Sequence, residues 1–402
     1  MGILFLVVFV DLVGFGVIIP LLPFYGEHFH ASPSQVGLLM AIYSFGQFLA
    51  APIWGQLSDR IGRKPVLVIS LIGATLSYLW LANATSLWML FAARAVGGVM
   101  AGNIGTAFAY VADITTPANR AKGMGVVGAA FGLGFIFGPA IGGILAGNDP
   151  AHADYVSPAL TAAALSGIAT LLAIFLLKES LSAETRRAHA ALPRSSRWRL
   201  LATALRTPVV GRLIVIAFLS TFVFAGMETT FAMWSRRAFG WGPEQNGYIF
   251  AFVGFTSALV QGGGVGRLAK RFGERALVIG GAAALAAGML AIPLSTTIPV
   301  LAAAMLIVAL GFSLMTPSLN SLVSLAVEKS VQGGTMGVSR SATTLARVLG
   351  PSWAGLLFEH AGRDWPFLAG AVLMSGVVLI ALGSTAARPA CEGGDVRGAD
   401  AP

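Results

Sequence analysis

A single carboxylate, Asp11, stands inside the almost unbroken apolar segment FVDLVGFGVIIPLLPFY at residues 9–25. A charged carboxylate in apolar surroundings is costly unless it is paired, and acids in such places usually have a function. A carboxyl that alternates between wet and dry surroundings can take up and release a proton. We therefore expect Asp11 to carry a proton. The alternative is that it is a structural partner for a buried arginine.

Four other charged side chains lie in similar apolar segments. Arg94 could pair with Asp11, and Glu228 is a second candidate proton site unless it lies near a membrane surface and contacts water. Arg340 and Arg347 are seven residues apart, so they share one face of a helix. These three cations outnumber the two acids, which favours a substrate with a negative group. An Arg340 side chain that reached the cytoplasm would remove this excess.

The segment FVFAGMETTFAMW at residues 222–234 places soft and aromatic side chains around Glu228. Phe224, Met227, Phe231 and Trp234 recur at helical spacing, and such a wall suits varied apolar ligands. The alternative is that these side chains face lipid or fill a core. The predicted substrate cavity comprises Asn103, Phe224, Met227, Phe231 and Arg347.

The composition places the chain in a membrane. Of its 402 residues 56% are hydrophobic and only 11% are charged, and the mean hydropathy is +0.79. A spanning helix needs roughly 20 mostly apolar residues. The chain supplies about twelve such segments, the first of which lacks the basic start of a cleaved signal peptide. The predicted spans are 2–23, 34–57, 65–83, 87–111, 122–146, 157–178, 209–234, 245–265, 275–294, 299–327, 333–358 and 365–386.

The lysines and arginines indicate the orientation. Most fall in alternate loops, around residues 60–64, 120–122, 178–212, 267–275 and 329, whereas the opposite loops hold only Arg236, Arg237 and Arg363. The rule that positive loops stay inside then places both termini in the cytoplasm. The net charge of +9 is thus a topology signal and does not indicate nucleic-acid binding. The single cysteine, Cys391, excludes an intrachain disulfide.

Two internal repeats divide the chain into halves. The segment GQLSDRIGRK from Gly55 resembles GRLAKRFGER from Gly266, at an offset of 211 residues, and GPAIGG from Gly138 resembles GPSWAG from Gly350, at an offset of 212. Repeated halves with a site between them are typical of transporters. The predicted organisation is an N-terminal bundle at 1–178, a cytoplasmic linker at 179–208, a C-terminal bundle at 209–386 and a polar cytoplasmic tail at 387–402.

Several motifs together resemble one family over residues 4–386. GQLSDRIGRKP resembles the loop signature of the major facilitator superfamily, and RAVGG from Arg94 resembles its second motif. DLVGFGVIIPLLP is similar to the first-span motif of drug/proton antiporters, and YVADITTPANRAKG to the tetracycline-efflux branch. The fifth span matches a pattern associated with proton-coupled antiporters at Gly125, Gly134, Gly138, Pro139, Gly142 and Gly143.

This resemblance implies an all-α membrane protein with twelve transmembrane helices in two pseudo-symmetric six-helix bundles. It also implies a central cavity lined by the first, fourth, seventh and tenth spans. Asp59, Arg63 and Asp113 would form a charge lock at the cytoplasmic gate. The gating motif as a whole comprises Gly55, Asp59, Arg60, Gly62, Arg63, Lys64 and Asp113. Lys270 replaces Asp59 in the second copy, so the lock should be asymmetric. The alternative is an ordinary positive-inside loop.

The fifth-span glycines also have a direct physical meaning. They lie mostly three or four residues apart, so they form a smooth helix face that another helix can approach closely. Pro139 should bend this span. Simple tight packing is the alternative to an antiport function, and both can hold.

The sequence favours a transporter over an enzyme or a pump. It contains no phosphate-binding loop, all five histidines fall in predicted loops, and we expect no cofactor or metal. We predict a secondary active transporter that exports a small amphipathic compound in exchange for protons by alternating access. The alternative is a proton-coupled or facilitative transporter of an endogenous metabolite or organic anion. We expect a monomer in a bacterial inner (plasma) membrane, with protons, substrate and membrane lipids as its partners.

The substrate need not be tetracycline itself. The tetracycline-efflux branch leads us to expect further acids in the third and ninth spans and a histidine in the eighth. The third span offers Ser77 instead, and the eighth offers Ser257 and Gln261.

Overall fold

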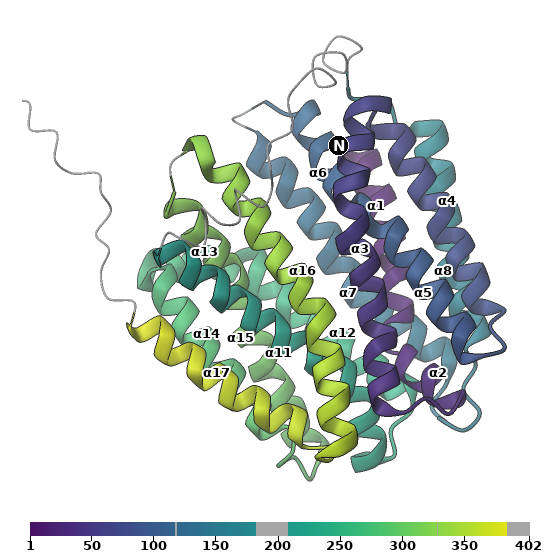
Figure 1. Ribbon diagram of the computed structural model, residues 1–402, viewed down its shortest axis with the longest axis vertical. Helices are drawn as coiled ribbons and strands as arrows, with labels where there is room; N and C mark the ends of the chain where they lie inside the picture. The colour runs from purple at the N-terminus through teal and green to yellow at the C-terminus, as the bar shows by residue number, and fades with distance from the viewer. Residues whose placement is uncertain (117–118, 182–207, 328, 384–402) are drawn as a thin grey trace, which may run out of the picture.

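A computed structural model describes residues 1–116, 119–181, 208–327 and 329–383 (Figure 1). Every regular element in these ranges is helical, which confirms the predicted all-α class. The predicted polar tail at 387–402 and most of the predicted linker lie outside the described residues.

The helices of the N-terminal half follow the predicted spans closely. They are α1 (Gly2–Ile18), α2 (Leu22–His28), α3 (Pro33–Ile61), α4 (Arg63–Ala82), α5 (Leu87–Met100), a short 3-10 turn η1 (Ala101–Asn103), α6 (Ile104–Ile114), α7 (Arg120–Ala146) and α8 (Val156–Leu176).

The C-terminal half repeats this arrangement. Its elements are α11 (Pro208–Phe239), α12 (Pro243–Leu259), the π-helical turn η2 (Val260–Gly264), α13 (Val265–Phe272), α14 (Glu274–Ala291), α15 (Ile298–Leu325), α16 (Lys329–His360) and α17 (Trp365–Gly383).

The predicted count of twelve spans is close to what the structure gives. By length and apolar composition, ten of the described helices can cross a membrane, or eleven if α1 and α2 form one bent span. The remaining predicted span, 333–358, which is the eleventh along the chain, lies within the 32-residue helix α16. That helix is long enough to cross a membrane, but it is not among the ten that are also sufficiently apolar. It carries two arginines, Arg340 and Arg347.

Proline and glycine explain where the long helices break. The α1–α2 pair bends by 41° at a break that contains Pro20, whose ring cannot donate a backbone hydrogen bond. Three consecutive glycines, 262–264, lie in the π-helical turn between α12 and α13. The chain turns between α3 and α4 at Gly62, whose φ of +112° favours glycine.

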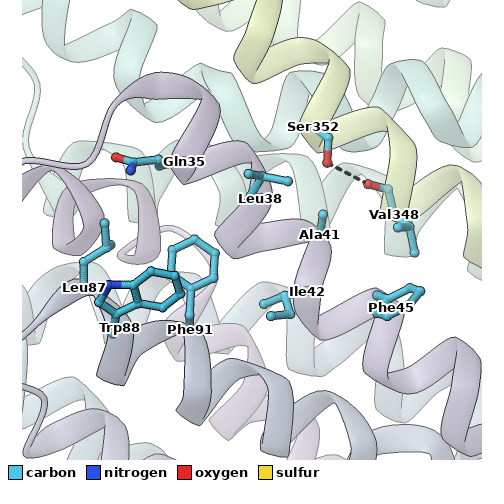
Figure 2. Close-up of a pocket in the computed structure, with 10 residues that line it drawn as sticks. All are labelled: Gln35, Leu38, Ala41, Ile42, Phe45, Leu87, Trp88, Phe91, Val348 and Ser352. Atoms are coloured by element: carbon cyan, nitrogen blue, oxygen red, sulfur yellow. Dashed lines mark hydrogen bonds between the residues drawn. The ribbon is translucent and has the colours of Figure 1, made fainter.

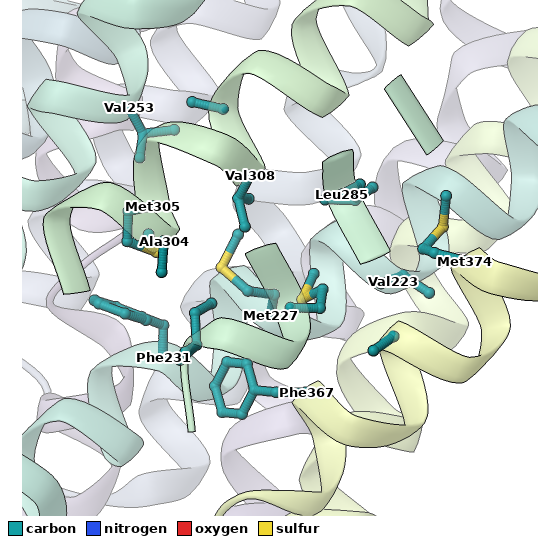
Figure 3. Close-up of a cluster of buried hydrophobic side chains, with 14 of the residues drawn as sticks. Val223, Met227, Phe231, Val253, Leu285, Ala304, Met305, Val308, Phe367 and Met374 are labelled. Atoms are coloured by element: carbon teal, nitrogen blue, oxygen red, sulfur yellow. The ribbon is translucent and has the colours of Figure 1, made fainter. Parts of the chain in front are cut away.

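Each half has its own apolar core. In the C-terminal half, α11, α14, α15 and α17 enclose a large cluster that includes Met227, Phe231, Leu285, Met305 and Phe367 (Figure 3). In the N-terminal half, the buried apolar side chains form separate, smaller clusters along α1, α4 and α8. Most of each cluster therefore lies within one half, although Ala31 and Val36 join the C-terminal cluster and Ala232 joins an N-terminal one.

The halves meet along two pairs of helices, α3 with α16 and α7 with α12 (Figure 1). At Gly37 a β-carbon would overlap the Pro351 carbonyl, and at Gly247 it would overlap the Pro139 carbonyl. These close approaches lie toward the end of the molecule that carries α2, which we call the α2 end. The opposite end, with Asp59 and Arg63, is the Asp59 end.

Candidate functional site

Asp11 lies on α1 in the interior of the N-terminal half. The fully buried Ser166 hydroxyl on α8 donates a 3.0 Å hydrogen bond to Asp11 Oδ1. No cation lies within ion-pair distance of this carboxylate among the residues that the structure describes. A single neutral donor compensates a buried negative charge only in part, so the site favours proton uptake when water is excluded.

Arg94 on α5 does not form the ion pair with Asp11 that the sequence allowed. Its guanidinium lies over the Tyr43 ring, 4.1 Å from the ring centroid, and only 4% of the residue is exposed. Its Nε has no hydrogen-bond partner among the described residues. Tyr43 and Tyr78 are near enough to interact electrostatically with both Asp11 and Arg94. The acid and the cation thus share one polar region while each lacks a counter-ion in the described part of the chain.

Glu228 and Arg347 form the corresponding polar pair of the C-terminal half. Glu228 Oε2 on α11 lies 3.9 Å from Arg347 Nη1 on α16. The Glu228 side chain is only 12% exposed, so most of this acid is covered by protein. Arg340 crosses to the other half, where its guanidinium lies 4.8 Å from the centroid of the Phe108 ring.

The predicted cavity wall is only partly where the sequence placed it. Met227 and Phe231 are 2% and 0% exposed and belong to the C-terminal core, which is the packing alternative (Figure 3). Thioether and aromatic side chains suit a core as well as a cavity, so their spacing could not separate the two. Phe224 stacks on Phe312 with ring centroids 3.9 Å apart. Asn103 donates a hydrogen bond to Ser70.

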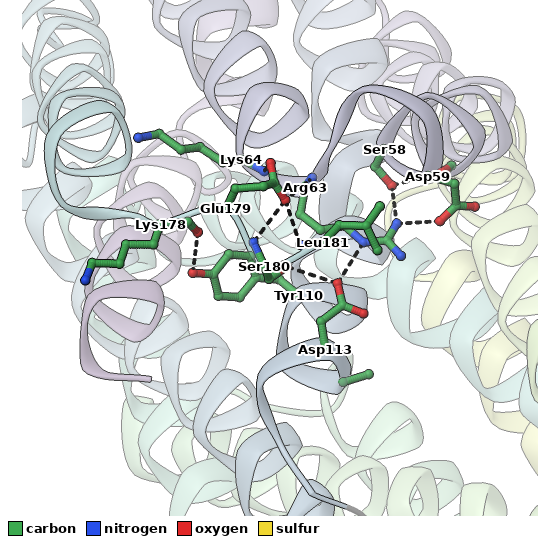
Figure 4. Close-up of polar contacts among 12 residues, drawn as sticks. Ser58, Asp59, Arg63, Lys64, Tyr110, Asp113, Lys178, Glu179, Ser180 and Leu181 are labelled. Carbon is green, nitrogen blue, oxygen red and sulfur yellow. Dashed lines mark hydrogen bonds and ion pairs between the residues drawn. The ribbon is translucent and has the colours of Figure 1, made fainter. Parts of the chain in front are cut away.

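The residues of the predicted charge lock are in contact (Figure 4). Arg63 Nη1 lies 2.6 Å from Asp59 Oδ1 and donates to Ser58 at 2.7 Å, and its Nε lies 3.1 Å from Asp113 Oδ2. Arg63 is only 5% exposed, so its charge depends on these partners. All of them belong to the N-terminal half. Arg60 and Lys64 are not part of this ion-pair set, although Lys64 Nζ donates to the Ile174 carbonyl.

Two residues that sequence reasoning missed complete this network. Glu179, at the start of the linker, accepts backbone hydrogen bonds from Arg63 at 2.9 Å and Lys64 at 3.2 Å, so it caps the N-terminus of α4. Ser180 donates to Asp113 at 3.0 Å. A β-carbon at Gly62 would overlap the Glu179 carboxylate. The sequence does show Glu179 as an acid just after the sixth predicted span, but nothing in its spacing indicates a contact with α4.

The fifth-span glycines on α7 allow two different helices to approach α7 closely. At Gly134, Gly138 and Gly142 an added β-carbon would overlap α1, whereas at Gly143 it would overlap α12 of the other half. Gly125 has open space around its β-carbon position. The motif thus fixes one contact within a half and one between halves.

At the α2 end, polar contacts join the two halves directly. Glu27 of α2 lies 2.7 Å from Arg236 of α11. Glu359 near the end of α16 accepts hydrogen bonds from the Ser32 hydroxyl at 2.8 Å and the Ser34 backbone at 2.9 Å. Hydrogen bonds from Ser34 and Ser32 lower the pKa of Glu359 to about 2. This carboxylate is therefore charged throughout the physiological pH range.

Charged and polar groups inside two repeated bundles of bilayer-length helices define a multi-pass membrane transporter. The sequence matches the Major Facilitator Superfamily over residues 4–351 and 237–395. The chain belongs to the major facilitator superfamily.

Relatives are found among drug-resistance proteins. The chain is 35% identical to the tetracycline resistance protein, class C, of Escherichia coli, over 89% of each chain. It is 32% identical to multidrug resistance protein 2 of Bacillus subtilis (strain 168), over 92% of each. Among solved structures it resembles the human organic anion transporter MFSD10, with a TM-score of 0.71, 28% identity and coverage of 94% and 98%.

Proposed function

We propose that the protein exports a small amphipathic compound in exchange for protons by alternating access. The observation that carries this proposal is Asp11, a carboxylate inside a membrane-spanning helix with one serine hydroxyl as its partner. A group that is so weakly compensated changes charge when water or a ligand reaches it. The tetracycline and multidrug resistance relatives support a drug or antibiotic as the substrate class.

The coupling follows from competition between proton and substrate. When the site opens outward, Asp11 takes up a proton; when it opens inward, it releases that proton, and the cavity is free to bind substrate. Each ligand shifts the conformational equilibrium through its differential affinity for the two states. Exchange then requires no direct contact between substrate and proton. Glu228, with its distant partner Arg347, is the second candidate proton carrier.

The gate contacts support one assignment of states. The Lys and Arg distribution assigns the Asp59 end to the cytoplasm and the α2 end to the outside. The cross-half contacts of Glu27 and Glu359 then close the outer side, and this arrangement belongs to the inward-facing state. The Asp59–Arg63–Asp113 contacts lie within the N-terminal half and are already present in this arrangement, and we expect them also to support the closed cytoplasmic side in the opposite state. The membrane is a bacterial inner membrane, and both termini are cytoplasmic.

Transport in inverted vesicles tests this proposal. With the proton gradient in place, vesicles that contain the protein should accumulate a compound from a panel of tetracyclines and other amphipathic drugs. Collapse of the gradient with an uncoupler should abolish accumulation. Asp149→Asn, in an exposed loop, is the matched control acid and should leave transport unchanged. Accumulation that survives the uncoupler would contradict proton coupling.

A second candidate function is transport of an organic anion. Arg94 is a buried cation without a carboxylate partner in the described ranges, and a structural neighbour is the organic anion transporter MFSD10. The sign of the pH effect separates the two candidates. Protonation of Asp11 removes a nearby negative charge, so it should strengthen the binding of an anion and weaken the binding of a cation. Substrate affinity is measured as a function of pH in the unmodified protein and in Arg94→Gln. The sign of the pH dependence decides between the two candidate functions.

A further inference from the structure

A groove of about 450 Å³ lies between α3, α5 and α16 (Figure 2). Its lining is almost entirely apolar. Most of the wall comes from Leu38, Ile42, Phe45, Trp88, Phe91 and Val348. Phe45 and Trp88 are 48% and 83% exposed, so the groove is open to the surrounding bilayer.

The groove has the depth of one membrane leaflet. It follows α3 from Gln35 to Phe45, ten residues along the helix. At 1.5 Å per residue this is about 15 Å, half of the roughly 30 Å hydrocarbon core of a bilayer. Trp88 is the second residue of α5, at a helix end where a tryptophan favours the membrane boundary. The groove thus extends from one membrane surface to about the midplane.

We propose that this groove binds one acyl chain of a phospholipid from the leaflet at the α2 end. An aliphatic chain needs only apolar contacts, which the leucine, isoleucine and aromatic side chains supply. The Ser352 hydroxyl already donates to the Val348 carbonyl, at 3.2 Å. Gln35 stands at the end of the groove nearest the membrane surface, where a lipid carries its polar part. A drug with several polar groups would leave them unpaired deeper in the groove.

Both halves contribute to the wall of the groove. Val348 and Ser352 belong to α16, whereas the other lining residues belong to the N-terminal half. Beside it, α3 and α16 approach backbone to backbone at Gly37, Pro351 and Gly355. Separation of these helices would remove the wall that α16 contributes to the groove. A bound acyl chain should therefore stabilise the arrangement that is closed at the α2 end, because a ligand favours the state that binds it.

Photolabelling of the full-length protein tests the site. The protein is reconstituted in vesicles of phosphatidylethanolamine and phosphatidylglycerol with a trace of phosphatidylethanolamine that carries a diazirine midway along one acyl chain. Peptides from the groove should be labelled about tenfold more than the exposed face of α17 around Val372 and Leu379. Equal labelling of the two surfaces would overturn the proposal.

Two variants that fill the groove separate occupancy from general lipid contact. Ile42→Trp and, independently, Ala41→Phe should lower labelling of the groove to the level of the α17 face. Val372→Trp, on that exposed face, is the matched control and should leave groove labelling unchanged. A filled variant that purifies as a folded protein should not show strong labelling of the groove. If it does, the acyl chain does not bind at the proposed position.

A cross-linking assay tests the conformational consequence. The variant Cys391→Ser gives a cysteine-free background, into which Ser32→Cys and Glu359→Cys are introduced on the two halves. Disulfide formation should be several-fold faster in phospholipid vesicles than in lipid-free detergent, with about fivefold expected. Ile42→Trp should remove this dependence on lipid. If the protein that retains Ile42 forms the disulfide at equal rates in vesicles and in detergent, the acyl chain does not stabilise the closed arrangement.

Discussion

The two halves of the molecule share a helical plan but differ in the chemistry of their interiors. The N-terminal half contains Asp11 with its serine partner, Arg94 against the Tyr43 ring and the network around Arg63. The C-terminal half has a large core of methionine, phenylalanine and leucine, and Glu228 with Arg347 is its interior ion pair among the described residues. The two halves thus share a helical arrangement, while most of the buried polar contacts described above lie in the N-terminal half.

The gate region shows the same difference. In the N-terminal copy, Arg63 contacts Asp59 and Asp113, and Glu179 caps the following helix. In the second copy Lys270 stands at the position of Asp59, and the described residues of that loop form no ion pair. A symmetric motion of the halves can therefore be controlled by an asymmetric lock. The following predictions test how far this division of chemistry extends.

The largest effect should come from Asp11→Asn. The amide resembles the protonated acid in shape and charge but cannot release a proton, so uphill export should fall to the level of empty vesicles. The folded structure should remain, because the Ser166 hydroxyl can still donate to the amide oxygen. Drug accumulation in inverted vesicles measures this effect. Export at the normal rate would remove Asp11 from the coupling mechanism.

Gly138→Leu should impair transport strongly through packing. A β-carbon at this position would overlap the backbone of Gly16, so α1 and α7 must move apart, at a cost of about 1–3 kcal/mol for overpacking. Gly125→Leu is the matched control, since it belongs to the same motif and faces open space. Thermal unfolding and transport of the two variants should therefore differ. Equal behaviour would mean that close approach of α1 and α7 is not required.

Asp59→Asn should slow transport by about fivefold with little change in protein abundance. Asp59 is half exposed, so its ion pair with Arg63 contributes modestly to stability, about 1 kcal/mol or less. We expect the substitution mainly to destabilise the state that is closed at the cytoplasmic side. Transport rate normalised to immunoblot signal measures it, and Lys270→Gln in the second copy should have less effect. Unchanged transport in Asp59→Asn would reduce the motif to a topology signal.

Glu359→Gln should have the smallest effect, at the junction between the halves. Since the pKa of Glu359 is about 2, well below that of a free carboxyl, the charged contact persists above that value and is lost only as pH falls through it. The stabilisation is lost as pH falls from the pKa of an unfolded-state carboxyl toward about 2, so stability should show no titration of this group between about pH 6 and 8. Glu359→Gln should lower the melting temperature slightly and equally across this range. A pH-dependent difference between the two proteins would contradict this assignment.

The sequence predicted the bundles well but not which polar groups would meet. Apolar length located the helices, and the two repeat offsets predict a division into halves. Neither signal contains the rotation of α1 and α5 about their axes. That rotation decides that Asp11 contacts Ser166 and that Arg94 contacts Tyr43.

Other differences have similarly local causes. Met227 and Phe231 have side chains that suit both a core and a binding surface, so only packing could assign them. Glu179 caps a helix that begins 116 residues earlier, as counted from Arg63, and no periodicity signals such a contact. By contrast, Asp59 and Arg63 are four residues apart, near the turn at Gly62, and the motif identified them correctly as neighbours.

The most direct test of the account is substrate-driven proton movement in proteoliposomes, with Asp11→Asn and Glu228→Gln measured side by side. A pH-sensitive dye inside the vesicles reports proton flow when substrate is added on one side. We expect Asp11→Asn to abolish this flow, and Glu228→Gln to reduce it without eliminating it. Proton exchange at the normal rate in Asp11→Asn, with loss in Glu228→Gln, would contradict the account and move the proton site to the C-terminal half.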